Sequence, residues 1–217
     1  MLPITLYSHP FGPNPWKVAL ILEELNIPYT TKFVDFSEVK KEPYIQLNPN
    51  GRLPSIEDPN TDITLWESGA IIEYLIEKYD VNHRLSYNTF AETYLAKQWL
   101  HFQASGQGPY YGQASWFTNL HPEKIQSVID RYANEIRRVT GVLESVLKTR
   151  EWLVGDKCTY ADLCFVAWQR WAPRYGGEDI YKGYPHVEAW LERMKMRPAV
   201  KKIYADQDFA MTEAQKK

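Results

Sequence analysis

The sequence predicts an α/β domain over residues 1–84, followed by an all-helical domain over residues 85–217. β-like and helical runs alternate in the first part, whereas only helical periodicity is found in the second. The stretch "DVNHRLSYN" at residues 80–88, between the two parts, is polar and aperiodic, which is typical of a linker. With 217 residues, of which 44% are hydrophobic, the chain can bury a sizeable core.

The first domain is predicted as a βαβ unit followed by a ββα unit. Strands are predicted at residues 4–8, 29–36, 53–58 and 62–66, and helices at residues 16–25 and 68–79. The first helix has one apolar face, formed by Val18, Ile21, Leu22 and Leu25. The first half of this order predicts a parallel strand pair with a crossover helix, and the second half an antiparallel extension.

The second domain is predicted to contain four helical segments, at residues 89–117, 122–149, 159–173 and 185–196, with shorter helical pieces after them. The third segment begins with "TYADL", where Thr159 is the expected N-cap and Asp162 completes a capping box. We therefore expect Asp162, like Asp156 just before it, to serve folding. Residues 207–217 are expected to fray, because the last ten residues have little to bury.

Composition excludes several classes of function. The formal net charge is −2 and no basic stripe is present, so we expect no nucleic-acid partner. No apolar run approaches the roughly 18 residues that span a bilayer, and the start "MLPITLYSHP" does not resemble a signal peptide, so a cytoplasmic protein is expected. Cys158 and Cys164 form no CxxC and no metal pattern, and are expected to be buried, reduced thiols; no metal site is expected.

Three loops of the first domain are expected to meet at one edge of the sheet, because each joins a strand to a helix or a hairpin. The first loop holds Asn14 between Pro13 and Pro15. Asn14 can act as an N-cap with Pro15 at the first helical position. The same helix N-terminus can also stabilise an anion such as a thiolate, and the residues alone leave both roles open.

The other two loops carry groups that suit a peptide-like ligand. In "NPNGRLPSIED", Pro54 heads a strand; a cis bond before it would expose the backbone of Leu53, although most X–Pro bonds are trans. In "LWESGAII", Ser68 can cap the following helix. A carboxylate would fit that helix N-terminus and an ammonium would fit Glu67, which together match the head of an amino acid. The alternative is a capped helix beside a surface acid.

In this order, the loops resemble those of the cytosolic glutathione transferases. The stretches "RLPSI", "WESGAIIEYL" and "LVGDKCTYADL" resemble the most recognisable parts of that family, and the resemblance covers roughly residues 4 to 206. "SHPFGPNPWKVALILEEL" resembles the branch of the fungal nitrogen-repression regulator and its bacterial Nu-class relatives. The resemblance implies a thioredoxin-like first domain, glutathione as co-substrate, a hydrophobic second substrate and a homodimer.

The resemblance also assigns roles to the residues of the first domain. Pro54 matches the family's cis-proline, and Leu53 would pair with the cysteinyl backbone of glutathione. Glu67 and Ser68 match the clamp on the γ-glutamyl group. Asn14 stands where other branches have a catalytic Tyr, Ser or Cys. Because its amide does not titrate usefully, we expect Asn14 to donate a hydrogen bond to the glutathione thiolate.

Further contacts are implied more loosely. Arg52, with Lys40 or Lys41, lies where the family contacts the glycyl end of glutathione. Arg131 matches an arginine that faces the tripeptide in Nu-class relatives, or is a surface charge.

The second-substrate site is expected in the helical domain, in "FQASGQGPYYGQASWF". Four aromatic residues could line its apolar wall or belong to the core, namely Tyr110, Tyr111, Trp116 and Phe117. Support for a homodimer in the residues themselves is limited to Phe90, Tyr94 and Trp99, which could equally be core.

The expected function is therefore that of a glutathione transferase that activates the thiol for attack on hydrophobic electrophiles, peroxides or disulfides. The alternative is a glutathione-binding regulatory protein with little catalysis. The chain starts directly at the first strand, without the long Asn-rich extension that a regulatory role would suggest, which favours the enzyme.

Overall fold

The structure is a computed structural model and describes residues 1–216. Its contacts divide the chain into two compact units. Unit 1 consists of residues 1–86 together with the chain from residue 195 onward, and unit 2 consists of residues 87–194. The predicted boundary at residue 84 lies two residues from the observed one, but the end of the chain belongs to the first unit and not to the second.

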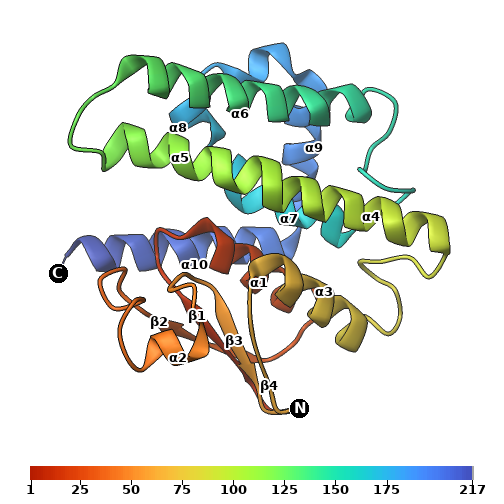
Figure 1. The fold of residues 1–217 in the computed structure, drawn as a ribbon. Coiled ribbons are helices and arrows are strands. Elements are labelled where there is room, and N and C mark those ends of the chain that lie inside the picture. The colour runs from red at the N-terminus through yellow and green to blue at the C-terminus, as the bar shows by residue number, and fades with distance from the viewer. Residues whose placement is uncertain (217) are drawn as a thin grey trace. The chain divides into compact units, whose positions relative to one another are not determined.

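Unit 1 contains a four-stranded mixed sheet with helices (Figure 1). Its elements are β1 (Ile4–Ser8), α1 (Pro13–Glu24), β2 (Tyr29–Phe33), α2 (Tyr44–Leu47), β3 (Ser55–Asp58), β4 (Ile63–Trp66), α3 (Ser68–Tyr79) and α10 (Pro198–Gln215). The strand order is β2-β1-β3-β4. β1 pairs with β2 in parallel and with β3 antiparallel, and β3 pairs antiparallel with β4. The predicted βαβ–ββα order is confirmed.

The strand register brings the three loops to one edge of the sheet. Tyr7 near the end of β1 lies opposite Ser55 at the start of β3, and Ser55 lies opposite Trp66 at the end of β4. The loop after β1, the loop before β3 and the loop after β4 therefore share an edge, as the sequence predicted.

The core of unit 1 surrounds α1, whose residues from Pro15 to Leu22 are all buried. α1 contacts β1, α3 and α10, so it has little face left for solvent. Because α1 is buried on several sides, its apolar residues are not confined to a single stripe.

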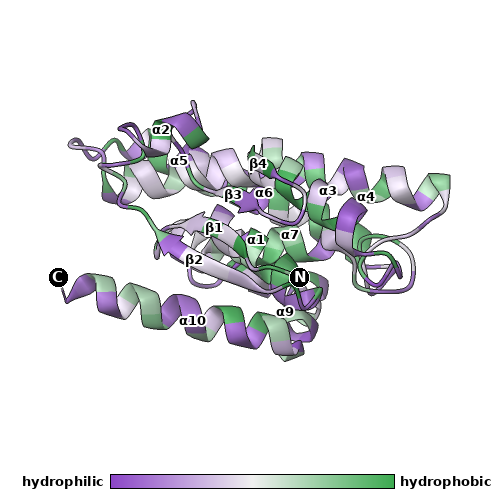
Figure 2. Cartoon of the chain, turned by 90° about the horizontal axis from the view of Figure 1, so that it is seen from below, coloured by the Kyte–Doolittle hydropathy of each residue, from purple (hydrophilic) through white to green (hydrophobic). Residues whose placement is uncertain are grey.

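The last helix, α10, covers residues that were expected to be short helical pieces and a frayed tail. It runs beside β2 in Figure 2 and is helical to Gln215, so the expected fraying of 207–217 does not occur in the described part. Gln207 is 1% exposed and its Nε2 donates to the carbonyl oxygen of Pro10 at 3.3 Å. Arg197 donates two hydrogen bonds to the carboxylate of Glu24, at 2.6 and 2.7 Å. These partners lie almost two hundred residues away, so the tail by itself gave no signal.

Unit 2 is helical (Figure 1). Its elements are α4 (Phe90–Phe102), a π-helical turn (Gln103–Gln107), α5 (Gly108–Asn119), α6 (Gln126–Leu147), α7 (Tyr160–Gln169), α8 (Ala172–Gly176), a 3-10 turn (Ile180–Gly183) and α9 (Pro185–Met196), whose last two residues belong to unit 1. The predicted helix 89–117 corresponds to α4 and α5, joined through the π-helical turn.

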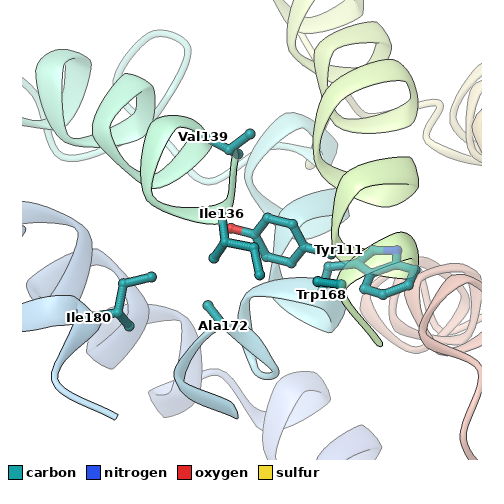
Figure 3. Close-up of a cluster of buried hydrophobic side chains, with 7 residues drawn as sticks. Tyr111, Ile136, Val139, Trp168, Ala172 and Ile180 are labelled. Carbon is teal, nitrogen blue, oxygen red and sulfur yellow. The ribbon is translucent and has the colours of Figure 1, made fainter. Parts of the chain in front are cut away.

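The core of unit 2 contains a cluster around Tyr111, whose ring lies between Ile136 and Trp168 in Figure 3. The Tyr111 hydroxyl donates to Oε1 of Gln169 at 3.0 Å, and Gln107 Nε2 donates to the same oxygen at 3.0 Å. These buried polar groups are paired with one another, which removes the cost of burying them.

The predicted capping box at α7 is confirmed, with Thr159 as N-cap and Asp162 bonded to its backbone N–H at 3.0 Å. Cys158 and Cys164 are both buried and unbridged, as expected. Within residues 1–216, no helix is long and apolar enough to cross a bilayer.

Candidate functional site

The loop after β1 presents Asn14 in the first turn of α1. The helix begins at Pro13 with Gly12 as N-cap, so the prediction of Asn14 as N-cap is wrong. Proline is pre-organised for the first helical position, which lets the helix begin earlier than expected. The indole N–H of Trp16 donates to the carbonyl oxygens of His9 and Pro10, both at 3.1 Å, and so holds the loop against the helix. Asn14 itself is half-buried.

The loop before β3 is fixed through the carbonyl oxygen of Arg52. The hydroxyl of Tyr44 and the amide of Asn48 both donate to this oxygen at 2.7 Å. The bond between Leu53 and Pro54 is cis, as the resemblance implied. Sequence reasoning missed Tyr44 and Asn48, since their role depends on a carbonyl several residues away.

The two candidate lysines point to different surroundings. The ammonium of Lys41 pairs with Glu38 at 2.8 Å. The stem of Lys40 lies over Gly51, where an added Cβ would be 3.0 Å from Lys40 Cγ. Within the described chain, neither Lys40 nor Arg52 takes part in an ion pair. The structure thus brings Lys40 to the loop that carries Arg52, and directs Lys41 to Glu38.

The loop after β4 ends in a strained residue. Glu67 has φ 69°, a left-handed conformation that is uncommon for a residue with a side chain. Glu67 is also the N-cap of α3, and Ser68 is the first helical residue, so the prediction of Ser68 as cap is wrong. Such strain is a reason to suspect a functional position.

The N-terminus of α3 is open to a ligand. A Cβ added at Gly69 would meet no atom within 4 Å, so space lies beside the first turn. The carboxylate of Glu67 is exposed and, within the described residues, unpaired. A helix N-terminus attracts a carboxylate, and Glu67 can hold an ammonium.

The spacing of the loops suits a short extended peptide. The loops belong to β1, β3 and β4 in that order across the sheet. Two strand spacings separate β1 from β4, which is about 10 Å. An extended tripeptide also spans about 10 Å. The edge therefore offers two helix N-termini with a polar loop between them, over the length of a tripeptide.

Comparison with known proteins decides the family. Residues 2–77 match the N-terminal domain of glutathione S-transferases, and residues 108–198 match their C-terminal domain. The chain belongs to the glutathione S-transferase family. The fold expected from the resemblance, a thioredoxin-like unit and a helical unit, is the fold of this family and is confirmed.

Individual proteins and solved structures are similar to this chain over most of its length. It is 53% identical over 216 residues to the glutathione S-transferase-like protein tpcF of Aspergillus fumigatus, covering 94% of this chain and 96% of that protein. It is 38% identical to protein URE2 of Kluyveromyces marxianus, covering 90% of this chain and 58% of that protein. The structure of glutathione transferase URE2P6 from Phanerochaete chrysosporium, in complex with oxidized glutathione, matches with a TM-score of 0.91 and 47% identity, covering 95% of this chain and 97% of that one.

The hydroxyl of Tyr7 is already engaged by Glu57, so Tyr7 is not a member of the candidate site. Its hydroxyl donates to the carboxylate of Glu57 at 2.6 Å, and its ring meets the edge of Tyr44. Burial and the bond to Glu57 raise the pKa of Tyr7 to about 12. Since residues alternate along a strand, Tyr7 faces away from the side on which Leu6 and Ser8 are buried.

His9 is held within the loop. Its ring stacks on Phe36 with centroids 3.7 Å apart, and its Nδ1 accepts a hydrogen bond from the backbone N–H of Phe11 at 3.2 Å. Burial lowers the pKa of His9, and the nearby Asp35 carboxylate only partly opposes this. His9 is therefore neutral near pH 7 and keeps the loop closed.

The four aromatic residues of the predicted second-substrate wall do not share one environment. Tyr111 is 0% exposed and lies in the core of unit 2. Tyr110 and Phe117 both contact the ring of Tyr132 on α6, with centroids 6.3 and 5.8 Å apart. Trp116 is exposed. Tyr111 therefore leaves the candidate wall, because a helix places successive residues about 100° apart and its neighbours take the outer faces.

Arg131 is exposed on α6 and forms no ion pair among the described residues. It remains a candidate contact for the tripeptide.

Proposed function

We propose that this protein is an active glutathione transferase that binds glutathione along the edge formed by the loops of β1, β3 and β4. The observation that carries the proposal is the open N-terminus of α3 beside the strained, unpaired Glu67. This pair supports binding of the γ-glutamyl head, with its carboxylate at the helix and its ammonium at Glu67. Leu53 would pair with the cysteinyl backbone, Arg52 and Lys40 with the glycyl carboxylate, and Arg131 with the outer side of the tripeptide.

The proposed chemistry begins with loss of the thiol proton to solvent, because the first turn of α1 carries no titratable side chain. The amide of Asn14 donates to the resulting thiolate, and the positive end of α1 adds to its stabilisation. One hydrogen bond to a charged group contributes about 1.5–3 kcal/mol, which corresponds to a decrease in thiol pKa of about one to two units.

The thiolate then attacks an electrophile, a peroxide or a disulfide. In the disulfide case a new S–S bond forms, the old S–S bond breaks, and the displaced sulfur leaves as a thiolate. The relative crystallised with oxidized glutathione binds such a disulfide, which supports this class of reaction here. A hydrophobic second substrate is proposed to contact Tyr110, Trp116 and Phe117, and a cytoplasmic role in detoxification or oxidative stress would follow.

A homodimer is part of the proposal. Phe90, Tyr94 and Leu95 on α4 are 80%, 58% and 44% exposed, and Phe90 and Tyr94 form an exposed aromatic pair with centroids 4.7 Å apart. Such a patch is better covered by a second copy than left in water. Trp99, also considered for this role, is buried within the unit.

The test is a pH titration of the ultraviolet absorbance of the glutathione thiolate bound to the protein. We expect a bound-thiol pKa well below the roughly 8.5 of a free cysteine. Asn14→Ala should raise it by about one to two units. Asn14→Asp should raise it further, because it removes the donor and adds a negative charge. If Asn14 only stabilised α1, Asn14→Asp would not lower the stability of the protein, since an acid is favourable in the first turn of a helix.

The matched control is Asn82→Ala, at an exposed position of the linker, which should leave the bound-thiol pKa unchanged. If glutathione binds with its thiol titrating as it does in water, the enzyme proposal fails. The similarity to protein URE2 would then favour the second candidate, a glutathione-binding regulatory protein with little turnover.

A further inference from the structure

A cleft lies within unit 1, between β2 and α10, apart from the edge formed by the three loops. Its volume is about 570 Å³, within the range of about 300–1,000 Å³ that is usual for small-molecule sites. In Figure 2, α10 runs beside β2 with its C-terminal half next to the end of that strand. None of the residues proposed to bind glutathione lines this cleft.

The walls of the cleft are aromatic. Phe33 on β2 is 51% exposed and Phe209 on α10 is 70% exposed, and both line the cleft. The buried ring of Trp16 lies between α1 and the cleft, 6.2 Å from the ring of Phe33. Two exposed phenyl rings on either side of one space suit a planar aromatic ligand, which would bury both.

The charge of the cleft is negative. Three carboxylates line it, those of Asp35, Asp206 and Glu213, and among the described residues 1–216 no Lys or Arg does. Hydrogen bonds from Ser37 hold the pKa of Asp35 below its ordinary value, so this carboxylate is ionised at neutral pH. His9, which also lines the cleft, is neutral there because burial lowers its pKa.

Neighbouring lysines cancel only part of this charge. Lys202 bonds both Asp206 and Glu23, at 2.7 and 2.6 Å, so one ammonium serves two carboxylates. Lys216 pairs with Glu213. The carboxylate of Asp35 has no lysine or arginine within ion-pair distance among the described residues. The aromatic walls therefore stand beside an excess of negative charge.

We propose that this cleft binds a planar aromatic cation, with its ring system between Phe33 and Phe209 and its positive charge toward Asp35. The site goes beyond glutathione binding and uses none of its residues. Cationic groups near aromatic faces and carboxylates gain from both contacts, whereas an anion of the same shape would be repelled. The cleft would thus give the protein a binding activity for aromatic cations that is separate from thiol transfer.

The test uses the full chain without glutathione and the cationic dye rhodamine 6G, measured by fluorescence anisotropy. Sulforhodamine B, which has the same xanthene ring system but carries sulfonates, is the matched anionic probe. We expect rhodamine 6G to bind at least tenfold more tightly at low salt, and its affinity to fall as salt screens the charges. Phe209→Ala and Asp35→Asn should each weaken its binding about fivefold.

The controls are Leu120→Ala, an exposed apolar residue of unit 2, and Asp179→Asn, an exposed acid that pairs with Lys182. Both should bind the dye as the unchanged protein does. Because Phe209 and Asp35 are exposed, the loss of either should not unfold the chain, which thermal melting will verify. Equal binding of the two dyes, or unchanged binding by both cleft variants, would overturn the proposal, whatever the outcome for Asn14.

Discussion

Asp162→Asn should destabilise unit 2 by about 3 kcal/mol without removing any group of the proposed glutathione site. Asp162 is 0% exposed, and each of its oxygens accepts two hydrogen bonds. Oδ1 accepts from the N–H of Leu153 and from the indole of Trp190, both at 3.0 Å. Oδ2 accepts from the backbone N–H and the hydroxyl of Thr159, at 3.0 and 3.2 Å.

The magnitude follows from what an amide can replace. Asparagine keeps one oxygen, so two of the four donors face an NH₂ group in place of an acceptor. The Thr159 hydroxyl can turn and accept, but its backbone N–H cannot. One orphaned buried N–H costs about 1–3 kcal/mol, and the two retained bonds lose their charge assistance. Burial raises the pKa of Asp162, so the neutral amide also relieves some desolvation, which keeps the total near 3 kcal/mol.

Thermal melting followed by near-ultraviolet circular dichroism measures the effect. A loss of about 3 kcal/mol corresponds to a decrease in Tm of about 6–12 °C for a chain of this size. Asp156→Asn is the control, since this exposed acid lies in the loop just before α7, bonds Tyr87 and should change Tm by less than about 2 °C. An unchanged Tm in Asp162→Asn would refute the reasoning. So would a stable variant that had lost thiol activation, because Asp162 would then serve chemistry.

Two further predictions concern charged groups that join distant elements. Glu144 on α6 accepts hydrogen bonds from the backbone and the ring of His186, and these outweigh the effect of burial and lower its pKa. Its stabilising contribution is complete above its unfolded pKa near 4.5 and is lost as the pH falls through the lower folded pKa. Glu144→Gln should therefore lower Tm by several degrees at pH 7, and much less at a pH below that folded pKa. Arg197→Ala should leave the buried Glu24 without its cation, cost about 3 kcal/mol, and speed hydrogen exchange in α10.

Each of these two predictions has a matched control variant. Glu135→Gln removes an acid of α6 whose partner Arg138 is exposed, and should give the same small change in Tm at both pH values. Lys202→Ala removes an exposed cation of α10 and should affect its exchange less than Arg197→Ala does. A pH-independent effect of Glu144→Gln, or unchanged exchange in Arg197→Ala, would show that these contacts are not the ones that hold the helices.

The parts of the fold that were predictable are those set by neighbouring residues. The strand at residues 4–8 and the helix at residues 68–79 match their observed bounds, because period-2 and period-3.6 patterns are read within a few residues. The capping box of Thr159 and Asp162 is likewise local. The return of α10 to unit 1 was not predictable, because its partners Glu24 and Pro10 lie far along the chain.

The same distinction applies to the candidate site. The meeting of the three loops follows from strand order, so the placement of Asn14, Pro54 and Glu67 at one edge could be predicted. Which lysine reaches the loop could not, because Lys40 and Lys41 are adjacent in sequence and only the packing over Gly51 separates them. The left-handed backbone of Glu67 could not be predicted either, because a glutamate gives no signal for a positive φ.

A site built in this way would stabilise a thiolate without a base. Asn14 does not titrate, Tyr7 has a pKa of about 12 and bonds Glu57, and His9 is occupied within its loop. None of these three side chains therefore has an ionisation near pH 7 that must precede the attack of the sulfur in the proposed enzyme. The rate would follow a single ionisation, that of the bound thiol, and the protein would act on that ionisation only through neutral donors and the dipole of α1. Such a site gives a moderate decrease in thiol pKa, which suits thiol–disulfide exchange because a thiolate loses nucleophilicity as its pKa falls.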